Sequence, residues 1–122
     1  MATPDKVNLA EKFRRFDQLW APRIVGQLNG QHVKLVKLKG EFVWHQHEIE
    51  DELFLVVQGE MTIQFRDAEV RLGEGEFLIV PAGVEHKPRA EHGAQVLLFE
   101  PLSTLNTGNV MDERTVSKLE WI

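Results

Sequence analysis

The hydrophobic pattern of this chain changes character at Pro22. Before that point, four large apolar residues recur at spacings of four, three and four, which is typical of one face of a helix: Leu9, Phe13, Phe16 and Trp20. Asn8 precedes them and is a suitable N-cap, because its side-chain oxygen accepts a hydrogen bond from the first turn. The sequence therefore predicts one amphipathic helix over residues 8–20.

After Pro22, short apolar runs alternate with turn residues. The strongest hairpin signal is Asn29-Gly30, because this dipeptide suits the tight turns that join antiparallel strands. The predicted extended segments are 23–28, 31–39, 41–47, 53–57, 61–66, 69–72, 77–80, 86–90 and 94–99. No helical pattern separates them, which excludes a parallel sheet with crossover helices and predicts an all-β antiparallel sandwich or barrel.

The pattern divides a single predicted domain, residues 1–122, into three parts. Residues 1–22 form the helical segment, 23–100 the barrel and 101–122 a polar C-terminal tail. The tail ends in Leu119, Trp121 and Ile122. Because large apolar side chains are costly to leave in water, we expect this end to dock on the barrel or on a second subunit.

Composition removes several classes of function. The 14 basic and 19 acidic residues give a net charge of −5, which argues against a nucleic-acid or polybasic membrane-surface protein. No apolar run is long enough for a membrane span, and the N-terminal residues do not resemble a signal peptide, so we expect a cytoplasmic protein. The absence of Cys excludes disulfides and thiolate metal sites, and the absence of Tyr excludes a phenolic acid or base.

The first candidate site residues are His45 and His47, which share one face if residues 41–47 are extended. Glu52 has the strand parity of the apolar residues Phe54 and Val56, and a carboxylate buried beside them needs a partner. A divalent cation is such a partner. The alternative interpretation is that His45 and His47 share an exposed strand face by chance and bind nothing.

The acidic residues around Glu52 are open to a simpler interpretation. Glu48, Glu50 and Asp51 are expected to form a solvated loop, with Asp51 as the replacement ligand if the parity is shifted by one residue. His32 and His92 lie near turns and are expected to be exposed, so neither is a candidate ligand.

His86 follows the turn Pro81-Ala82-Gly83 and completes the candidate cluster. Three imidazoles and one carboxylate suit one divalent transition metal per chain, with Mn, Fe, Ni, Co and Zn all compatible. Four protein ligands leave two positions of an octahedral site open for water, dioxygen or a chelating substrate.

These residues resemble the two motifs of the cupin family. His45-Gln46-His47, four residues, Glu52, six residues and Gly59 match the first motif, while Gly75, five residues, Pro81-Ala82-Gly83, two residues and His86 match the second. Two departures concern residues other than ligands. Four residues separate Gly40 from His45 where the family has five, and Ala90 stands where the family has Asn.

The resemblance implies an antiparallel jelly-roll barrel that holds the metal through His45, His47, Glu52 and His86. Residues sharing the inner face are then expected to line an apolar substrate pocket: Val43, Phe54, Val56, Met61, Ile63 and Phe65. Lys34 is the best candidate for a cation in that pocket, although the hydrophobic pattern does not fix its face.

Three functions agree with a metal site beside an apolar pocket. The first is a dioxygenase acting on a small enol, diketone or hydroxy-acid, with Glu52 also serving in catalysis. The second is a metal-dependent isomerase, lyase or sugar-processing enzyme. The third is a non-catalytic small-molecule-binding protein. The cupin resemblance and the unpaired edge strands of a small barrel also predict a homodimer.

Overall fold

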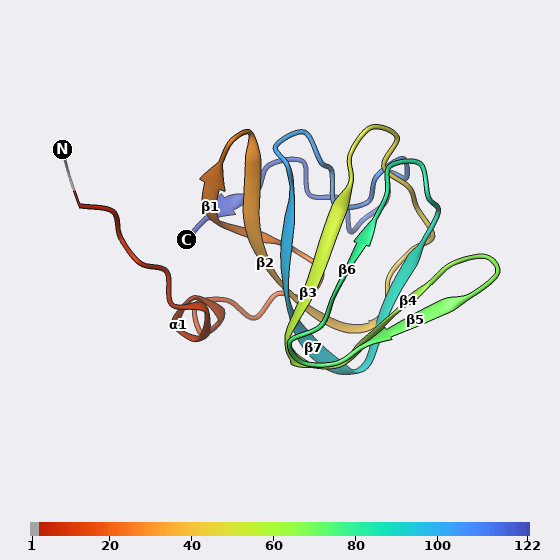
Figure 1. Cartoon of the computed structure of the whole chain (residues 1–122), viewed down its shortest axis with the longest axis horizontal. Coiled ribbons are helices and arrows are strands. Elements are labelled where there is room, and N and C mark those ends of the chain that lie inside the picture. Colours follow the sequence, from red (N-terminus) through yellow and green to blue (C-terminus); the bar gives the residue numbers. More distant parts are fainter. Residues whose placement is uncertain (1–2) are drawn as a thin grey trace.

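The computed structural model describes residues 3–122 and shows a barrel of antiparallel strands preceded by a short helix (Figure 1). The helix is α1, Leu9–Phe13. The strands are β1 (Arg23–Leu28), β2 (Gln31–Glu41), β3 (Glu52–Gly59), β4 (Met61–Gln64), β5 (Glu69–Leu72), β6 (Phe77–Val80), β7 (Lys87–Pro101) and β8 (Glu120–Trp121). The all-β prediction is confirmed. No helix in these residues is long and apolar enough to cross a membrane.

Strand β7 connects the two halves of the barrel. It pairs with β2 along most of its length, with β4 through its first residues and with β3 through its later ones, all antiparallel. The sequence predicts two strands here, 86–90 and 94–99, but the structure contains one. Gly93 has φ 97°, a conformation that glycine adopts without strain, so the strand changes direction there without ending.

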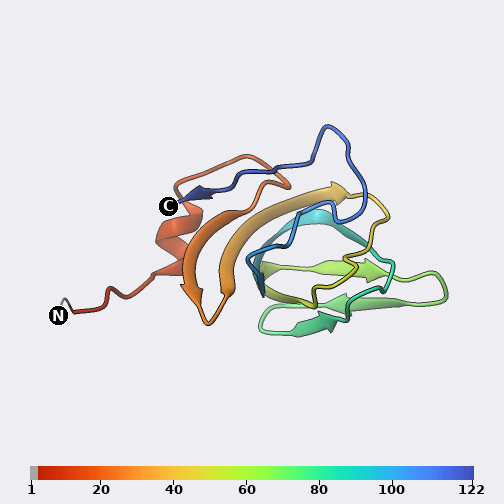
Figure 2. The same ribbon diagram turned by 90° about the horizontal axis from the view of Figure 1, so that it is seen from above.

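The barrel interior is formed by inward-facing residues of β2, β3, β4 and β7, as strand alternation predicts. A smaller apolar cluster lies outside the barrel, where Phe13 and Phe16 pack on Val25 and Leu35 of β1 and β2. Figure 2 shows α1 against the outer side of these strands. The N-terminal segment therefore covers one face of the barrel and stays away from its interior.

The predicted helix over residues 8–20 is wrong in its length, because α1 ends at Phe13. The following segment binds strand β2 through hydrogen bonds that replace helical ones. The side chain of Lys37 donates to the Phe16 carbonyl (2.6 Å), and the Trp20 amide donates to the Lys37 carbonyl (2.9 Å). Phe16 is still buried. The apolar spacing therefore identified residues that pack together, although the helix ends before Phe16.

The C-terminal end docks on the barrel of its own chain. Strand β8 pairs in parallel with β1, and the Ile122 amide donates to the Ile24 carbonyl (3.0 Å). Before reaching β1, the blue C-terminal segment arches over one end of the barrel (Figure 2). Of the two docking sites expected for the apolar tail, the structure has the one within the chain, although the Trp121 side chain stays 57% exposed.

Candidate metal centre

The predicted segment 41–47 is extended only in part. Strand β2 ends at Glu41, and the chain then meets the start of β7 at a single antiparallel bridge between His45 and His86. Each of these histidines donates its backbone N–H to the carbonyl of the other, at 3.0 and 2.9 Å. The bridge brings the two predicted motifs together and places their rings 4.3 Å apart, centre to centre.

Backbone carbonyls orient two of the imidazoles. Nδ1 of His45 lies 2.9 Å from the Val43 carbonyl, and Nδ1 of His86 lies 2.9 Å from the Val84 carbonyl. In the neutral ring this hydrogen bond places the proton on Nδ1 and leaves the lone pair on Nε2. Metal-binding histidines in proteins are commonly fixed by a bond of this kind.

The remaining two candidates complete a buried group. His47 Nε2 lies 3.2 Å and His86 Nε2 lies 3.5 Å from Oε1 of Glu52. One possible ligand atom from each of His45, His47, Glu52 and His86 lies within 4.8 Å of the others, and all four residues are buried. The structure therefore brings together the four side chains that the sequence selected.

The chemistry of these donors fits a metal ion. His47 Nε2, Glu52 Oε1 and His86 Nε2 are buried and have no hydrogen-bond partner among the described residues. Buried polar atoms without a partner are costly, and a divalent cation would satisfy several at once. A mixed set of imidazole nitrogens and one carboxylate suits a first-row transition metal.

Burial shapes the charges of this cluster. It lowers the pKa of His45 to about 4, and the neighbouring His86 adds to that effect. Burial alone would raise the pKa of Glu52, but the neighbouring Glu100, His47 and His86 outweigh it and hold the pKa well below its usual range. A neutral imidazole and an ionised carboxylate are the protonation states that bind a metal.

A second buried carboxyl group adjoins the cluster. Glu100 is close enough to Glu52 to influence its pKa, and it accepts a hydrogen bond from Nζ of Lys34 (2.9 Å). Burial and the charge of Glu52 raise the pKa of Glu100 well above its usual range, against the opposing effect of Lys34. Lys34 thus lies on the inner face, where it pairs with Glu100 and is almost fully buried.

The acidic residues around Glu52 remain outside the cluster. Asp51, the replacement ligand considered from the sequence, is exposed and accepts from the Ala82 amide (2.8 Å), which holds the turn before His86. Glu50 accepts from the hydroxyl of Ser103 (2.6 Å). His92 is exposed, as expected, whereas His32 is half-buried against Trp121.

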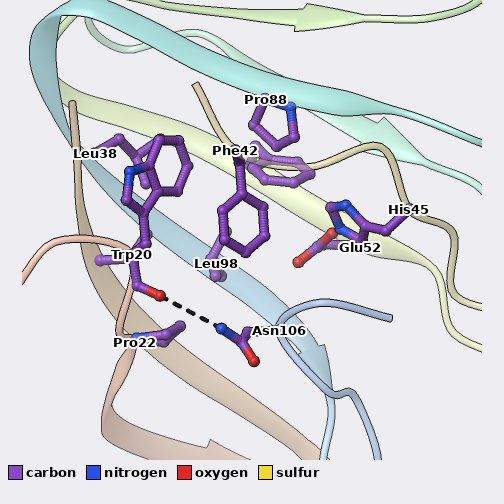
Figure 3. A pocket seen from close by; sticks show the side chains of 11 residues that line it. Trp20, Pro22, Leu38, Phe42, His45, Glu52, Pro88, Leu98 and Asn106 are labelled. Atoms are coloured by element: carbon purple, nitrogen blue, oxygen red, sulfur yellow. Dashed lines mark hydrogen bonds between the residues drawn. The ribbon is translucent and has the colours of Figure 1, made fainter. Parts of the chain in front are cut away.

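A small apolar cavity opens beside His45 and Glu52 (Figure 3). Its volume is about 30 Å³, and its wall is almost entirely apolar. The cavity is lined by Trp20, Pro22, Val36, Leu38, Phe42, His45, Glu52, Phe54, Pro88, Leu98 and Asn106. Trp20 and Phe42 stack with ring centres 4.7 Å apart, and Asn106 donates to the Trp20 carbonyl (3.4 Å).

The predicted pocket residues lie in different places. Phe54 lines the cavity. Val56, Met61 and Ile63 face inward but belong to the fully buried core, while Phe65 packs at its edge. Val43 is half-buried and contributes its carbonyl to His45. The apolar lining of this cavity comes instead mainly from β2, β7, Trp20 and Phe42.

Comparison with known proteins decides the family. The family model described as "Cupin domain" matches residues 32–100, which is more than half of the chain. The chain belongs to the cupin family. The two motifs quoted from the sequence, the barrel and the buried histidine–glutamate cluster agree with this membership.

Two relatives are similar to this cupin in sequence. A cupin-2 domain protein of Shewanella frigidimarina NCIMB 400 has a similar crystal structure, with 44% identity, coverage of 78% of this chain and 93% of that chain, and a TM-score of 0.77. The uncharacterized protein YdbB of Bacillus subtilis (strain 168) is 37% identical over 67 residues, 54% of this chain and 59% of its own length. This cupin therefore matches less than two thirds of YdbB.

A more distant structure shares only the fold. It is hydroquinone 1,2-dioxygenase PnpCD, in complex with Cd²⁺ and 4-hydroxybenzonitrile. The two chains are 20% identical, the match covers 77% of this cupin and 71% of that chain, and the TM-score is 0.66.

Sequence reasoning missed several residues around the site. Glu100 shares the inward parity of Val96 and Leu98, so the alternation along β7 could have revealed it. Strand alternation could not have revealed Trp20 and Phe42. Trp20 reaches the cavity from the misjudged helix, with φ 61°, and Phe42 lies beyond the end of β2.

Proposed function

We propose that this cupin is a metal-dependent enzyme, a dioxygenase that acts on a small enol, diketone or hydroxy-acid. The observation that carries the proposal is a buried His-His-Glu-His cluster with unpartnered donor atoms beside an apolar cavity. The shared fold of a hydroquinone dioxygenase is compatible with this chemistry.

His45, His47, Glu52 and His86 are the residues proposed to hold the metal. A redox-active ion in that position supplies the Lewis acidity and electron transfer that oxygen chemistry requires. Trp20 and Phe42 exclude water from one side of the cavity. Since a volume of about 30 Å³ holds only a small number of water molecules, a substrate enters by displacing side chains at this wall.

The carboxyl group of Glu100 favours a second candidate. Glu100 is buried, and the charge of the neighbouring Glu52 helps to raise its pKa, so it could supply a proton at this site. A metal-dependent isomerase or lyase would use this pair to transfer a proton at the carbon next to a carbonyl. This second candidate needs no dioxygen.

Metal identity and oxygen uptake separate the two candidates. The protein, purified without added metal, is analysed for its elements, and separate samples are then stripped and reloaded with Fe²⁺, Mn²⁺ or Zn²⁺. Oxygen uptake with iron or manganese and a diketone or enol supports the dioxygenase. Turnover of hydroxy-acids or ketones without oxygen uptake, with zinc as effective as iron, supports the isomerase or lyase, because zinc has no redox chemistry. No metal uptake by any sample contradicts both.

Glu52 is proposed to act in catalysis as well as in binding. Replacing Glu52 with Gln keeps the size but removes one negative charge from the cluster, so the variant is expected to bind metal more weakly. With excess metal restored, turnover should still fall below that of the original protein, because the carboxylate also tunes the metal or moves a proton. Metal content and turnover are measured on the same sample. Full recovery would leave Glu52 a structural ligand only.

The proposal includes a homodimer. Leu53 and Leu55 of β3 lie beside Ile79 and Phe77 of β6, and the latter two are 51% and 60% exposed. These four residues form an apolar patch on the outer face, beyond the part that α1 covers. Strand β1 (Arg23–Leu28) is paired with β2 on one side and, at Arg23 and Ile24, with β8 on the other.

A further inference from the structure

The C-terminal tail contacts the chain segment that carries two of the candidate ligands. Gln46 lies between His45 and His47, and Asn109 binds both of its backbone groups. The Gln46 amide donates to Oδ1 of Asn109 (2.9 Å), and the Asn109 amide donates to the Gln46 carbonyl (3.0 Å). One tail residue therefore fixes the peptide groups on both sides of Gln46.

Gly108 brings the tail close enough for these bonds. Its φ is 57°, in the left-handed region that glycine adopts without strain. A Cβ atom at this position would overlap the Gln46 carbonyl oxygen and lie 3.1 Å from Cδ2 of His45. The tail backbone thus packs directly against a ligand ring, at a distance that no other residue type permits without movement.

The contacting segment is itself anchored. Thr107 is fully buried, and its hydroxyl is hydrogen-bonded to that of Thr115 (2.7 Å). The Asn106 side chain donates to the Arg114 carbonyl (2.8 Å) and accepts from the Val116 amide (2.9 Å). These bonds tie the tail into a compact loop, so residues 106–109, here called the tail clamp, present a preformed surface to Gln46.

His47 is the ligand that depends most on such support. His45 and His86 each have a carbonyl partner for Nδ1, whereas Nδ1 of His47 is buried with no partner among residues 3–122. The orientation of His47 is therefore set through its backbone. The Gly83 amide donates to its carbonyl (2.7 Å), and the tail clamp holds the preceding residue.

We propose that the tail clamp positions the metal ligands, with Gly108 and Asn109 as positioning residues that act through Gln46 on His45 and His47. This inference rests on the proposed metal binding. It extends the metal centre beyond residues 32–100, the part of the chain that matches the family, to a segment with no ligand of its own. Partners that orient ligands typically change metal affinity by about tenfold or more when removed.

The test measures Co²⁺ binding to chelator-stripped protein by competition with a chromophoric chelator, together with the visible Co²⁺ spectrum, which reports coordination geometry. Gly108→Ala is expected to weaken Co²⁺ binding by about tenfold and to change the spectrum. The matched control is Gly75→Ala. Gly75 also has a positive φ (80°), but nothing lies within 4 Å of a Cβ there, so the variant carries similar backbone strain without the overlap.

A second pair of variants separates positioning from general stability. Asn109→Ala removes the acceptor for the Gln46 amide and is expected to weaken Co²⁺ binding by about fivefold. Asn109→Asp keeps an oxygen at that position and should restore both the affinity and the spectrum. The melting temperature of each metal-free variant is recorded, because a purely structural role would lower it without changing the spectrum.

The outcomes are distinct. Original protein that takes up no Co²⁺ overturns the metal proposal and the clamp with it. If the original protein binds Co²⁺ and Gly108→Ala has the same affinity and spectrum, the clamp alone is overturned. An equal loss of Co²⁺ affinity in Gly75→Ala and Gly108→Ala also overturns the clamp. If Gly108→Ala does not fold, the Asn109 pair decides, since equal binding by the Ala and Asp variants overturns the clamp.

Discussion

At the scale of single residues, the three histidines of the cluster are supported in different ways. Carbonyl partners fix the tautomers of His45 and His86, whereas Nδ1 of His47 has no partner in the part of the chain that the structure describes and Nε2 lies beside Glu52. These differences give each residue its own expected response to mutation and to pH.

Replacing His47 with Ala is expected to reduce metal affinity by tenfold or more, because one of four donors is lost. Metal content per chain after dialysis, measured by elemental analysis, checks this expectation. His92→Ala is the control, because His92 is exposed and outside the cluster. Full metal occupancy in His47→Ala would show that His47 is not a ligand.

The pH dependence of stability follows from His45. Its pKa is about 4 in the folded chain, against 6.5 when unperturbed, because burial disfavours the charged ring. Above pH 6.5 both states are neutral and His45 has no effect. As pH falls from 6.5 towards 4, the unfolded chain takes up the proton first, so metal-free protein loses up to about 3 kcal/mol of unfolding free energy.

Urea denaturation of metal-free protein between pH 7 and pH 4.5 measures this loss. His45→Gln should have a flatter profile, since its side chain does not titrate. The difference between the two proteins is the informative quantity, because the raised pKa of Glu100 contributes an opposite slope to both. Parallel profiles would contradict the assignment.

At the scale of elements, strand alternation predicted most of the barrel. Glu52, Phe54 and Val56 are buried in alternation, as their parity requires. The helix was overestimated because apolar spacing reports which side chains pack together, and Phe16 packs from a segment that binds β2. The predicted break between segments 86–90 and 94–99 was wrong, because a glycine can bend a strand without ending it.

The candidate ligands were predictable because their spacing is local within each motif, and the bridge then joins the motifs. The residues around them were not, because they come from distant parts of the chain. Lys34 meets Glu100, and Gln46 meets Asn109, through contacts that no local pattern encodes. Sequence spacing thus indicated the donor atoms, and the three-dimensional fold was needed for what surrounds them.

Helix α1 gives a prediction about stability alone. Phe13 is 1% exposed in the outer apolar cluster, so Phe13→Ala should cost about 3–5 kcal/mol of unfolding free energy. Metal content should not change, because this cluster lies outside the barrel. Denaturant unfolding and elemental analysis of the same sample test both statements. Arg14→Ala, at an exposed position, should change stability by less than about 0.5 kcal/mol.

At the scale of the whole molecule, the apolar patch of Leu53, Leu55, Phe77 and Ile79 predicts self-association. Phe77→Glu places a charge within this patch and is expected to convert a dimer into a monomer, because burying an unpaired charge is costly. Sedimentation velocity at micromolar concentration measures the change. Met111→Glu is the control, since Met111 is 74% exposed but lies in the tail. A monomeric original protein would refute the dimer.

If the cluster binds a metal as proposed, the bridge between His45 and His86 makes the stability of the folded chain depend on metal supply. The bridge joins His86 to the segment that carries His45 and His47, which lies far from it in sequence, so the complete donor set exists only after folding. An ion that binds the folded chain alone shifts the folding equilibrium by mass action, by about 2.7 kcal/mol at a hundred times its dissociation constant. Metal starvation would therefore increase the unfolded population, and with it the fraction open to proteolysis.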